Sequence, residues 1–149
     1  MSDTTEPSVT ITRQSGYQFL VDFGAALPGL LADEPAPLGT DTGPSPNQLL
    51  LAAVANCLCA SLLFALGKFK QDPGGLSATA TARMGRNEAK RLRMLGIDVQ
   101  LHLGKDAASI EHLDRVLAQF EEFCTVSMSV KQGIELTIRV DDASHQSLK

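Results

Sequence analysis

The sequence has little positive charge and nothing that resembles an export signal. Thirteen Lys and Arg against 17 Asp and Glu give a net charge of −4 and a pI of about 5.3. Nucleic-acid-binding proteins usually carry a basic face, so this balance argues against that class. The first eight residues are polar and acidic, without the basic start and apolar run of a signal peptide. We therefore expect a cytoplasmic protein that binds no nucleic acid.

Motifs for metals and cofactors are also lacking. Cys57 and Cys59 are too close in sequence for a zinc knuckle, and the three histidines are scattered. There is no glycine-rich phosphate-binding loop and no internal repeat. With Cys124, the chain has three cysteines and no export signal, which favours a reducing compartment. We expect neither a metal nor a cofactor.

Charge is absent from residues 49–66, and this segment predicts one long helix. Ser45 suits the N-cap, Pro46 suits the first helical position, and Gln48 completes an S-x-x-Q capping box. Gly67 is a suitable stop. The helix therefore begins at Ser45 and ends near residue 66.

This apolar helix raises the question of a membrane span. Its 18 residues are at the lower limit of length for one. Five alanines, two cysteines, Asn56 and Ser61 make it weakly hydrophobic, and no aromatic belt flanks it. We expect no membrane contact and a helix buried on all sides. Because a chain of this size can cover only one side, we expect its second side to pack against another copy, as a homodimer.

The remaining pattern predicts an α+β fold with helices against largely antiparallel sheets, in a single domain covering residues 1–149. Residues 1–7 and 142–149 are expected to be loose tails. Alternation of apolar and polar residues predicts strands at residues 8–13, 17–23, 77–84, 91–103 and 134–140, and a short strand within 29–35. An amphipathic helix is predicted for residues 107–123, followed by an irregular stretch at 125–132.

The cysteines allow two interpretations. Buried free cysteines are usually inert and behave as small hydrophobic residues. Alternatively, Cys57 and Cys124 form a redox pair, in which one thiol becomes a sulfenic acid and the other condenses with it to a disulfide. That chemistry needs a thiolate with a lowered pKa. Cys57 is in the middle of a helix and gains little from the helix dipole, whereas Cys124 is at a helix end, where exposure is easier.

Two motifs carry a resemblance to a known family. Residues 43–53 (GPSPNQLLLAA), followed by Cys57, resemble the central-helix motif of the OsmC/Ohr family, the osmotically inducible and organic hydroperoxide resistance proteins. Residues 33–35 and 39–46 are similar to an OsmC-like branch. Cys124 and residues 125–127, followed by residues 133–136, resemble the family's second motif, commonly Cys-Pro-Val-Ser, with Thr125 in place of Pro.

The resemblance implies an OsmC-like fold, in which antiparallel sheets wrap around a buried central helix in an intertwined homodimer. It also implies a thiol peroxidase that reduces organic hydroperoxides and is regenerated by a dithiol reductant. Cys57 would be the peroxidatic cysteine and Cys124 the resolving one, in an apolar pocket at the dimer interface. Cys59 has no family role and is expected to fill space in the core.

The sequence departs from the active members at the charges that support the thiolate. They use an arginine held by a glutamate near the start of the central helix, but here those positions are Asn47 and Gln48. No arginine occurs between Gln14 and Ala82, and the only early one is Arg13. Arg13, Asn47 and Gln48 are therefore supporting candidates. Two functions stay open: a peroxidase, or a family member with weak or no peroxidase activity that binds a small apolar ligand or senses redox state.

Overall fold

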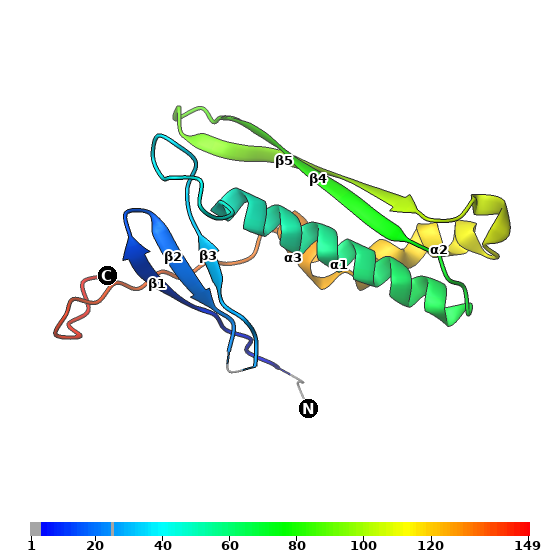
Figure 1. The fold of residues 1–149 in the computed structure, drawn as a ribbon, viewed down its shortest axis with the longest axis horizontal. Coiled ribbons are helices and arrows are strands. Elements are labelled where there is room, and N and C mark those ends of the chain that lie inside the picture. Colours follow the sequence, from blue (N-terminus) through cyan, green and yellow to red (C-terminus); the bar gives the residue numbers. More distant parts are fainter. Residues whose placement is uncertain (1–3, 25) are drawn as a thin grey trace. The chain divides into compact units, whose positions relative to one another are not determined.

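A computed structural model describes residues 4–24 and 26–149 (Figure 1). The chain is a mixed α+β protein with antiparallel sheets, as predicted. Its contacts divide it into two compact units. The first unit contains Met1–Ala55 and Ala78–Gln100, and the second contains Asn56–Ser77 and Leu101–Lys149.

A three-stranded antiparallel sheet in the first unit confirms the predicted hairpin and short third strand (Figure 1). The central strand β2 pairs with both neighbours, with Ile11 opposite Val21 and Phe19 opposite Ala32. Gly16 turns the hairpin with φ +49°, a conformation that glycine adopts easily. The strands are β1 (Thr10–Ser15), β2 (Gln18–Asp22) and β3 (Leu30–Ala32).

The apolar helix α1 (Pro46–Lys68) begins where the capping box predicted. The backbone N–H of Gln48 donates to Ser45 Oγ at 3.3 Å. In return, the backbone N–H of Ser45 donates to Gln48 Oε1 at 2.9 Å. Two N–H groups that the first turn of a helix leaves without partners are thus satisfied.

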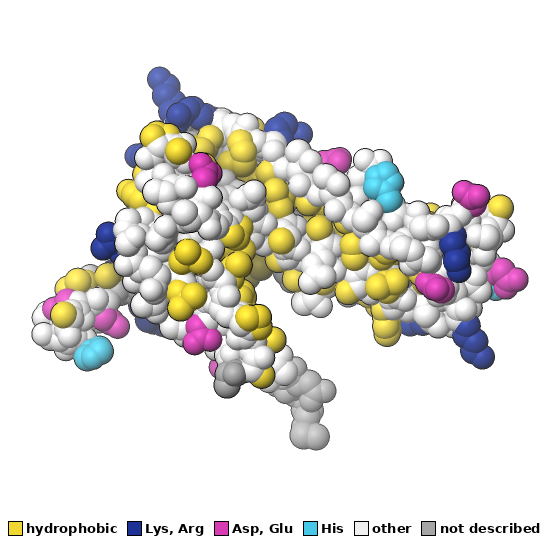
Figure 2. Space-filling view, in the orientation of Figure 1, with side chains coloured by type: hydrophobic (Ala, Val, Ile, Leu, Met, Phe, Trp, Pro, Cys, Tyr) yellow, Lys and Arg dark blue, Asp and Glu magenta, His cyan; other side chains and the backbone are white. Residues whose placement is uncertain are grey.

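The prediction that α1 is buried on all sides is wrong for the isolated chain. Leu62 and Leu66 are buried, with 2% and 0% of their surface exposed, but Leu63 and Phe64 are 47% and 58% exposed. Hydrophobic side chains are visible along the course of α1 in Figure 2. Among the described residues, α1 is the one helix that is long and apolar enough to cross a membrane. The core helix of a soluble protein can have the same length and composition.

A long hairpin follows α1 in the sequence. Its strands, β4 (Leu76–Arg86) and β5 (Leu92–Leu103), are close to the predicted ones. Asn87 shapes the turn, because its side-chain oxygen accepts a hydrogen bond from the backbone N–H of Arg91 at 2.9 Å. Short polar side chains of this kind commonly stabilise turns.

The continuous helix predicted for residues 107–123 is wrong. His112 adopts a left-handed conformation with φ +60°, which interrupts the helix. Two contacts within the second unit hold this break: the Glu111 N–H donates to Gln71 Oε1 at 3.0 Å, and the His112 ring packs on Phe69 with centroids 4.9 Å apart. The segment forms η1 (Ala107–Ser109), α2 (Leu113–Gln119) and η2 (Phe120–Phe123).

The stretch predicted to be irregular instead forms helix α3 (Thr125–Gln132). Cys124 is its N-cap, and Gly133, with φ +76°, ends it. A short sequence with three β-branched residues and two serines has little helix propensity of its own, so its capping side chain and packing decide the conformation.

The strand predicted for residues 134–140 does not form within the described chain. Its alternating apolar side chains lie in the open: Ile134, Leu136 and Ile138 are 69%, 80% and 57% exposed. No strand of the described residues pairs with this segment. Beyond it the chain folds back through an isolated antiparallel bridge between Asp141 and Ser147.

Candidate thiol site

The second unit brings together the two cysteines that the sequence singled out. Cys57 lies on α1, and Ser61 follows it by four residues, so both side chains share a helix face. Cys124 is at the start of α3. The side chains of Cys57 and Ser61 both lie close enough to the Cys124 sulfur to lower its pKa by hydrogen bonding. The predicted pair therefore lies close together in the second unit, with Cys57 half-buried and Cys124 buried.

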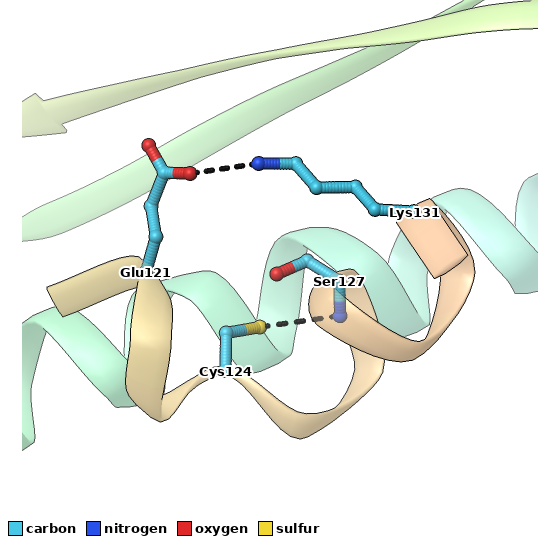
Figure 3. A network of polar contacts seen from close by, with 4 residues as sticks. All are labelled: Glu121, Cys124, Ser127 and Lys131. Atoms are coloured by element: carbon cyan, nitrogen blue, oxygen red, sulfur yellow. Dashed lines mark hydrogen bonds and ion pairs between the residues drawn. The ribbon is translucent and has the colours of Figure 1, made fainter.

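Cys124 is more enclosed than its place in the sequence suggested. None of its surface is exposed, so the expectation of an accessible sulfur at a helix end is wrong. The reason is that residues 125–132 continue as a helix that covers it. The backbone N–H of Ser127, in the first turn of α3, donates to Cys124 Sγ at 3.4 Å (Figure 3).

The surroundings of Cys124 favour its charged form. Burial raises the pKa of this thiol, because an apolar setting disfavours a thiolate. The hydroxyl and N–H of Ser127, together with the side chains of Cys57 and Ser61, are placed to stabilise a thiolate, and they oppose that effect and outweigh it. The pKa of Cys124 consequently lies below its ordinary value, as is typical of a cysteine at a helix N-terminus.

The hydroxyl of Ser127 has no hydrogen bond among the described residues. The residue is 7% exposed, and its Oγ is buried beside the Cys124 sulfur (Figure 3). Buried hydroxyls nearly always have a partner, so an unused one needs an explanation. The hydroxyl is therefore a hydrogen-bond donor without an acceptor in the described part of the chain, and it lies next to a sulfur that can become charged.

Aromatic packing and an ion pair hold the segment that carries Cys124. The rings of Phe64 on α1 and Phe123 on η2 meet edge to face, with centroids 5.5 Å apart. Lys68 Nζ lies 4.1 Å from the Phe123 centroid, a cation–π contact. Lys131 Nζ and Glu121 Oε2, 2.9 Å apart, join the residues on either side of Cys124 (Figure 3). That exposed pair contributes little energy, so the rings do most of the anchoring.

Cys59 has a different environment, although it is only two residues from Cys57. It is half-buried, and burial raises the pKa of its thiol. Residues that are two positions apart on a helix point in different directions, so Cys59 does not face the same side as Cys57. Nowhere in residues 4–24 and 26–149 do three His, Cys, Asp or Glu side chains gather closely enough to hold a metal ion.

The three supporting candidates all belong to the first unit. Arg13 is exposed, and its Nε donates to the Gly16 carbonyl oxygen at 2.9 Å, within its own hairpin. Gln48 is engaged in the capping box, and Asn47 is exposed in the first turn of α1. Their participation at the thiol site stays a prediction.

Sequence reasoning missed Ser61 and Ser127 as members of the site. Each had a signal: Ser61 lies one helical turn after Cys57, and Ser127 is the last residue of the Cys-x-x-Ser motif. In a helix that begins at Cys124, the third residue is the one whose N–H reaches the cap. Recognising that helix from the sequence would have placed Ser127 at the sulfur.

A buried carboxylate organises the loop before α1 in the first unit. Asp33 is 2% exposed and accepts five hydrogen bonds, from the backbone N–H of Glu34 and from the N–H and hydroxyl groups of Thr40 and Thr42. The Thr40 hydroxyl, and then the other donors, hold the pKa of Asp33 well below its usual range, although burial opposes them. The loop is thereby closed around a charge.

Next to Asp33 the first unit has an apolar cavity of about 280 Å³. Side chains of the three-stranded sheet form one wall, and the first turn of α1 forms another. A volume of this order is at the lower end of small-molecule sites. The lining residues are Ile11, Tyr17, Phe19, Val21, Ala32, Asp33, Glu34, Pro46 and Leu49.

Comparison with known proteins places both motifs in one family. The model of the family described as OsmC-like protein matches residues 39–139. The fold is similar to an OsmC-like protein from Mycoplasma pneumoniae (TM-score 0.69, 14% identity, 87% of this chain and 89% of that one). It is also similar to an organic hydroperoxide resistance protein from Legionella pneumophila (TM-score 0.66, 18% identity, 86% of this chain and 92% of that one). A third similar structure is an organic hydroperoxide resistance protein from Elizabethkingia anophelis (TM-score 0.63, 22% identity, 88% of this chain and 93% of that one). No protein of curated function matches significantly.

Proposed function

The chain belongs to the OsmC-like family, and on that premise we propose that it is a cysteine-based thiol peroxidase acting on organic hydroperoxides. The observation that carries this proposal is the proximity of the Cys57 and Cys124 side chains. Two thiols from distant parts of the sequence, one of them in a setting that favours its thiolate, are what a disulfide-forming peroxidase requires.

The proposed cycle begins at Cys57, the less enclosed of the two thiols. Its thiolate attacks the terminal oxygen of the hydroperoxide, the O–O bond breaks, and the alcohol leaves after taking up a proton. Cys57 is then a sulfenic acid. The Cys124 thiolate attacks that sulfur, the S–O bond breaks, and water leaves with one further proton, which gives the Cys57–Cys124 disulfide. A dithiol, available in a reducing cytoplasm, returns both cysteines to thiols.

A homodimer belongs to the same proposal, and two exposed surfaces support it. The first is the open face of α1, where Leu50, Leu63 and Phe64 are 40%, 47% and 58% exposed. The second is residues 134–140, an alternating segment without a pairing strand. Exposed apolar patches and unpaired strands promote association, because association removes apolar surface from water and pairs the backbone groups. A second copy would cover the face and supply the strand partner.

The apolar cavity beside Asp33 favours a second candidate function. Its volume of about 280 Å³ and its apolar walls suit a small hydrophobic molecule. Asn47 and Gln48 stand where active relatives are expected to have charged support, so turnover could be slow. In that case the chain would be a ligand-binding or redox-sensing member of the family.

The decisive experiment follows cumene hydroperoxide consumption with dihydrolipoamide as the dithiol. The intact protein, Cys57→Ser and Cys124→Ser are compared, and Cys59→Ser serves as the matched control. We expect Cys57→Ser to abolish turnover, Cys124→Ser to abolish recycling after one equivalent, and Cys59→Ser to stay within about twofold of the intact protein.

Peptide mapping after peroxide treatment completes the test. A Cys57–Cys124 disulfide is the expected product. Equal rates in the intact protein, Cys57→Ser and Cys124→Ser would overturn the peroxidase. Tight binding of cumyl alcohol without turnover would favour the ligand-binding function.

A further inference from the structure

The two sulfurs of the proposed disulfide differ in how they can react with a reductant. Cys57 is half-buried, whereas Cys124 has no exposed surface. A thiolate approaching from solvent therefore reaches Cys57 first. Disulfide exchange also depends on the departing sulfur, since a more stabilised thiolate leaves faster.

Among the described residues, hydrogen-bonding groups that can stabilise a charge surround the Cys124 sulfur. The Ser127 N–H donates to Cys124 Sγ at 3.4 Å, from the first turn of the eight-residue helix α3. The Ser127 hydroxyl, from a residue 93% buried, has no hydrogen bond of its own among the residues described. A small rotation of the Ser127 side chain that brings its O–H to the sulfur would give a charge-assisted hydrogen bond to a thiolate.

We propose that the reductant attacks Cys57 of the disulfide, that Cys124 is the leaving group, and that Ser127 stabilises the departing thiolate through its N–H and its hydroxyl. This inference rests on the proposed function only for the identity of the disulfide. It assigns the direction of the reductive half-reaction, and it explains why a buried hydroxyl is kept without a partner in the reduced protein.

The exchange balances as follows. One thiolate of the dithiol attacks Cys57 Sγ and forms a mixed disulfide, the Cys57–Cys124 bond breaks, and its electron pair leaves on Cys124 Sγ. The second thiol of the reductant, as its thiolate, attacks the reductant sulfur of the mixed disulfide. Cys57 leaves as a thiolate, and the reductant becomes a cyclic disulfide. The two protons of the dithiol neutralise the two cysteines, so two electrons pass from the reductant to the protein.

The first test maps the mixed disulfide. The disulfide is prepared with diamide, so that its formation does not depend on peroxidase activity. It is then treated briefly with one equivalent of glutathione, blocked with N-ethylmaleimide in acid and digested for mass spectrometry. We expect glutathione on Cys57 and maleimide on Cys124. Glutathione mainly on Cys124, or failure of diamide to link Cys57 with Cys124, overturns the inference.

The second test measures leaving-group stabilisation. Ser127→Ala should slow reduction of the diamide-formed disulfide by dithiothreitol by about three- to tenfold, the expected effect of losing one hydrogen bond to a developing charge. Ser127→Thr, which keeps the hydroxyl, should recover most of the rate. Ser129→Ala is the matched control, with the same substitution two residues further along α3.

A purely structural role for Ser127 would not move the titration of the sulfur. In a Cys57→Ser, Cys59→Ser background, thiolate absorbance at 240 nm follows Cys124 alone. We expect Ser127→Ala to shift that titration to higher pH and Ser129→Ala to leave it unchanged. Equal reduction rates and equal titrations for both alanine variants would overturn the inference. If hydroperoxide turnover is absent while these results hold, only the proposed peroxidase fails.

Discussion

The backbone N–H of Ser127 donates a hydrogen bond to Sγ of Cys124 at 3.4 Å, which makes a cysteine the N-cap of helix α3. A thiol is a weak acceptor, but a thiolate is a strong one. The contact therefore contributes more when Cys124 is charged, and it couples the protonation state of the sulfur to the order of the helix.

Thr125 is the first residue of α3, and replacing it tests this account of the helix start. Proline suits a first helical position, because its fixed φ matches and no N–H is needed there. Cys124, which precedes it, is extended with φ −85° and ψ 98°, as a residue before proline prefers. We expect Thr125→Pro to leave the free energy of unfolding unchanged or raise it by up to ~1 kcal/mol, by urea denaturation. A loss of more than ~1 kcal/mol would contradict the assigned start.

Asp33 should make stability depend on pH. Its pKa in the folded protein is below the unfolded value of 3.8, so its ionised form stabilises the fold fully above about pH 5. That contribution is lost as the pH falls below 3.8 toward the folded pKa. Asp33→Asn should therefore lower the urea midpoint clearly at pH 7 and much less at pH 3.

Asp41→Asn is the control for Asp33. Asp41 is exposed on the same loop and accepts one hydrogen bond, from Ala36 N–H at 3.2 Å. Its substitution should change the midpoint little at either pH. A gap between Asp33→Asn and the intact protein that is as large at pH 3 as at pH 7 would show that the five contacts do not act through charge.

The capping box predicts a ranked set of stabilities. Ser45→Ala should lower the free energy of unfolding by about 1 kcal/mol, because the Gln48 N–H loses its acceptor. Gln48→Ala should cost less, and the double variant should cost less than the sum, because the two side chains form one reciprocal unit. Asn47→Ala, between them and exposed, should cost under about 0.5 kcal/mol. Strict additivity in urea denaturation would argue against the box.

Leu62 and Leu63 are neighbours on α1 with opposite surroundings. Leu62→Ala should lower the free energy of unfolding by about 2–5 kcal/mol, because it leaves a cavity around a side chain that is 2% exposed. Leu63 is 47% exposed, so Leu63→Ala should cost far less in the monomer. If the open face of α1 is a dimer surface, Leu63→Arg should instead lower the molar mass in sedimentation. An unchanged mass would argue against that surface.

The sequence was informative wherever local chemistry decided the structure. Ser45, Gln48 and Asn87 act through side chains a few residues away, so the start of α1 and the β4–β5 turn could be predicted. The helix break at His112 could not, because it depends on Gln71, 40 residues before Glu111. Periodicity alone describes residues 107–123 as one amphipathic helix.

At the candidate thiol site, the sequence predicted the two cysteines but not the two serine hydroxyls beside them. Cys57 and Cys124 carry recognisable motifs, but Ser61 and Ser127 become relevant only once α3 is known to be a helix that covers the sulfur. The strand expected at residues 134–140 was wrong for a related reason. Alternation shows that a segment suits a sheet, but it says nothing about whether a neighbouring edge exists.

That unpaired segment has a thermodynamic consequence. With Leu136 80% exposed, a lone copy has apolar area that association would remove from water. Under the proposed dimer, the strand forms when two chains meet, and the free energy of that step depends on protein concentration through mass action. Dilution would then act as a denaturant, so we expect the thermal midpoint to rise with protein concentration.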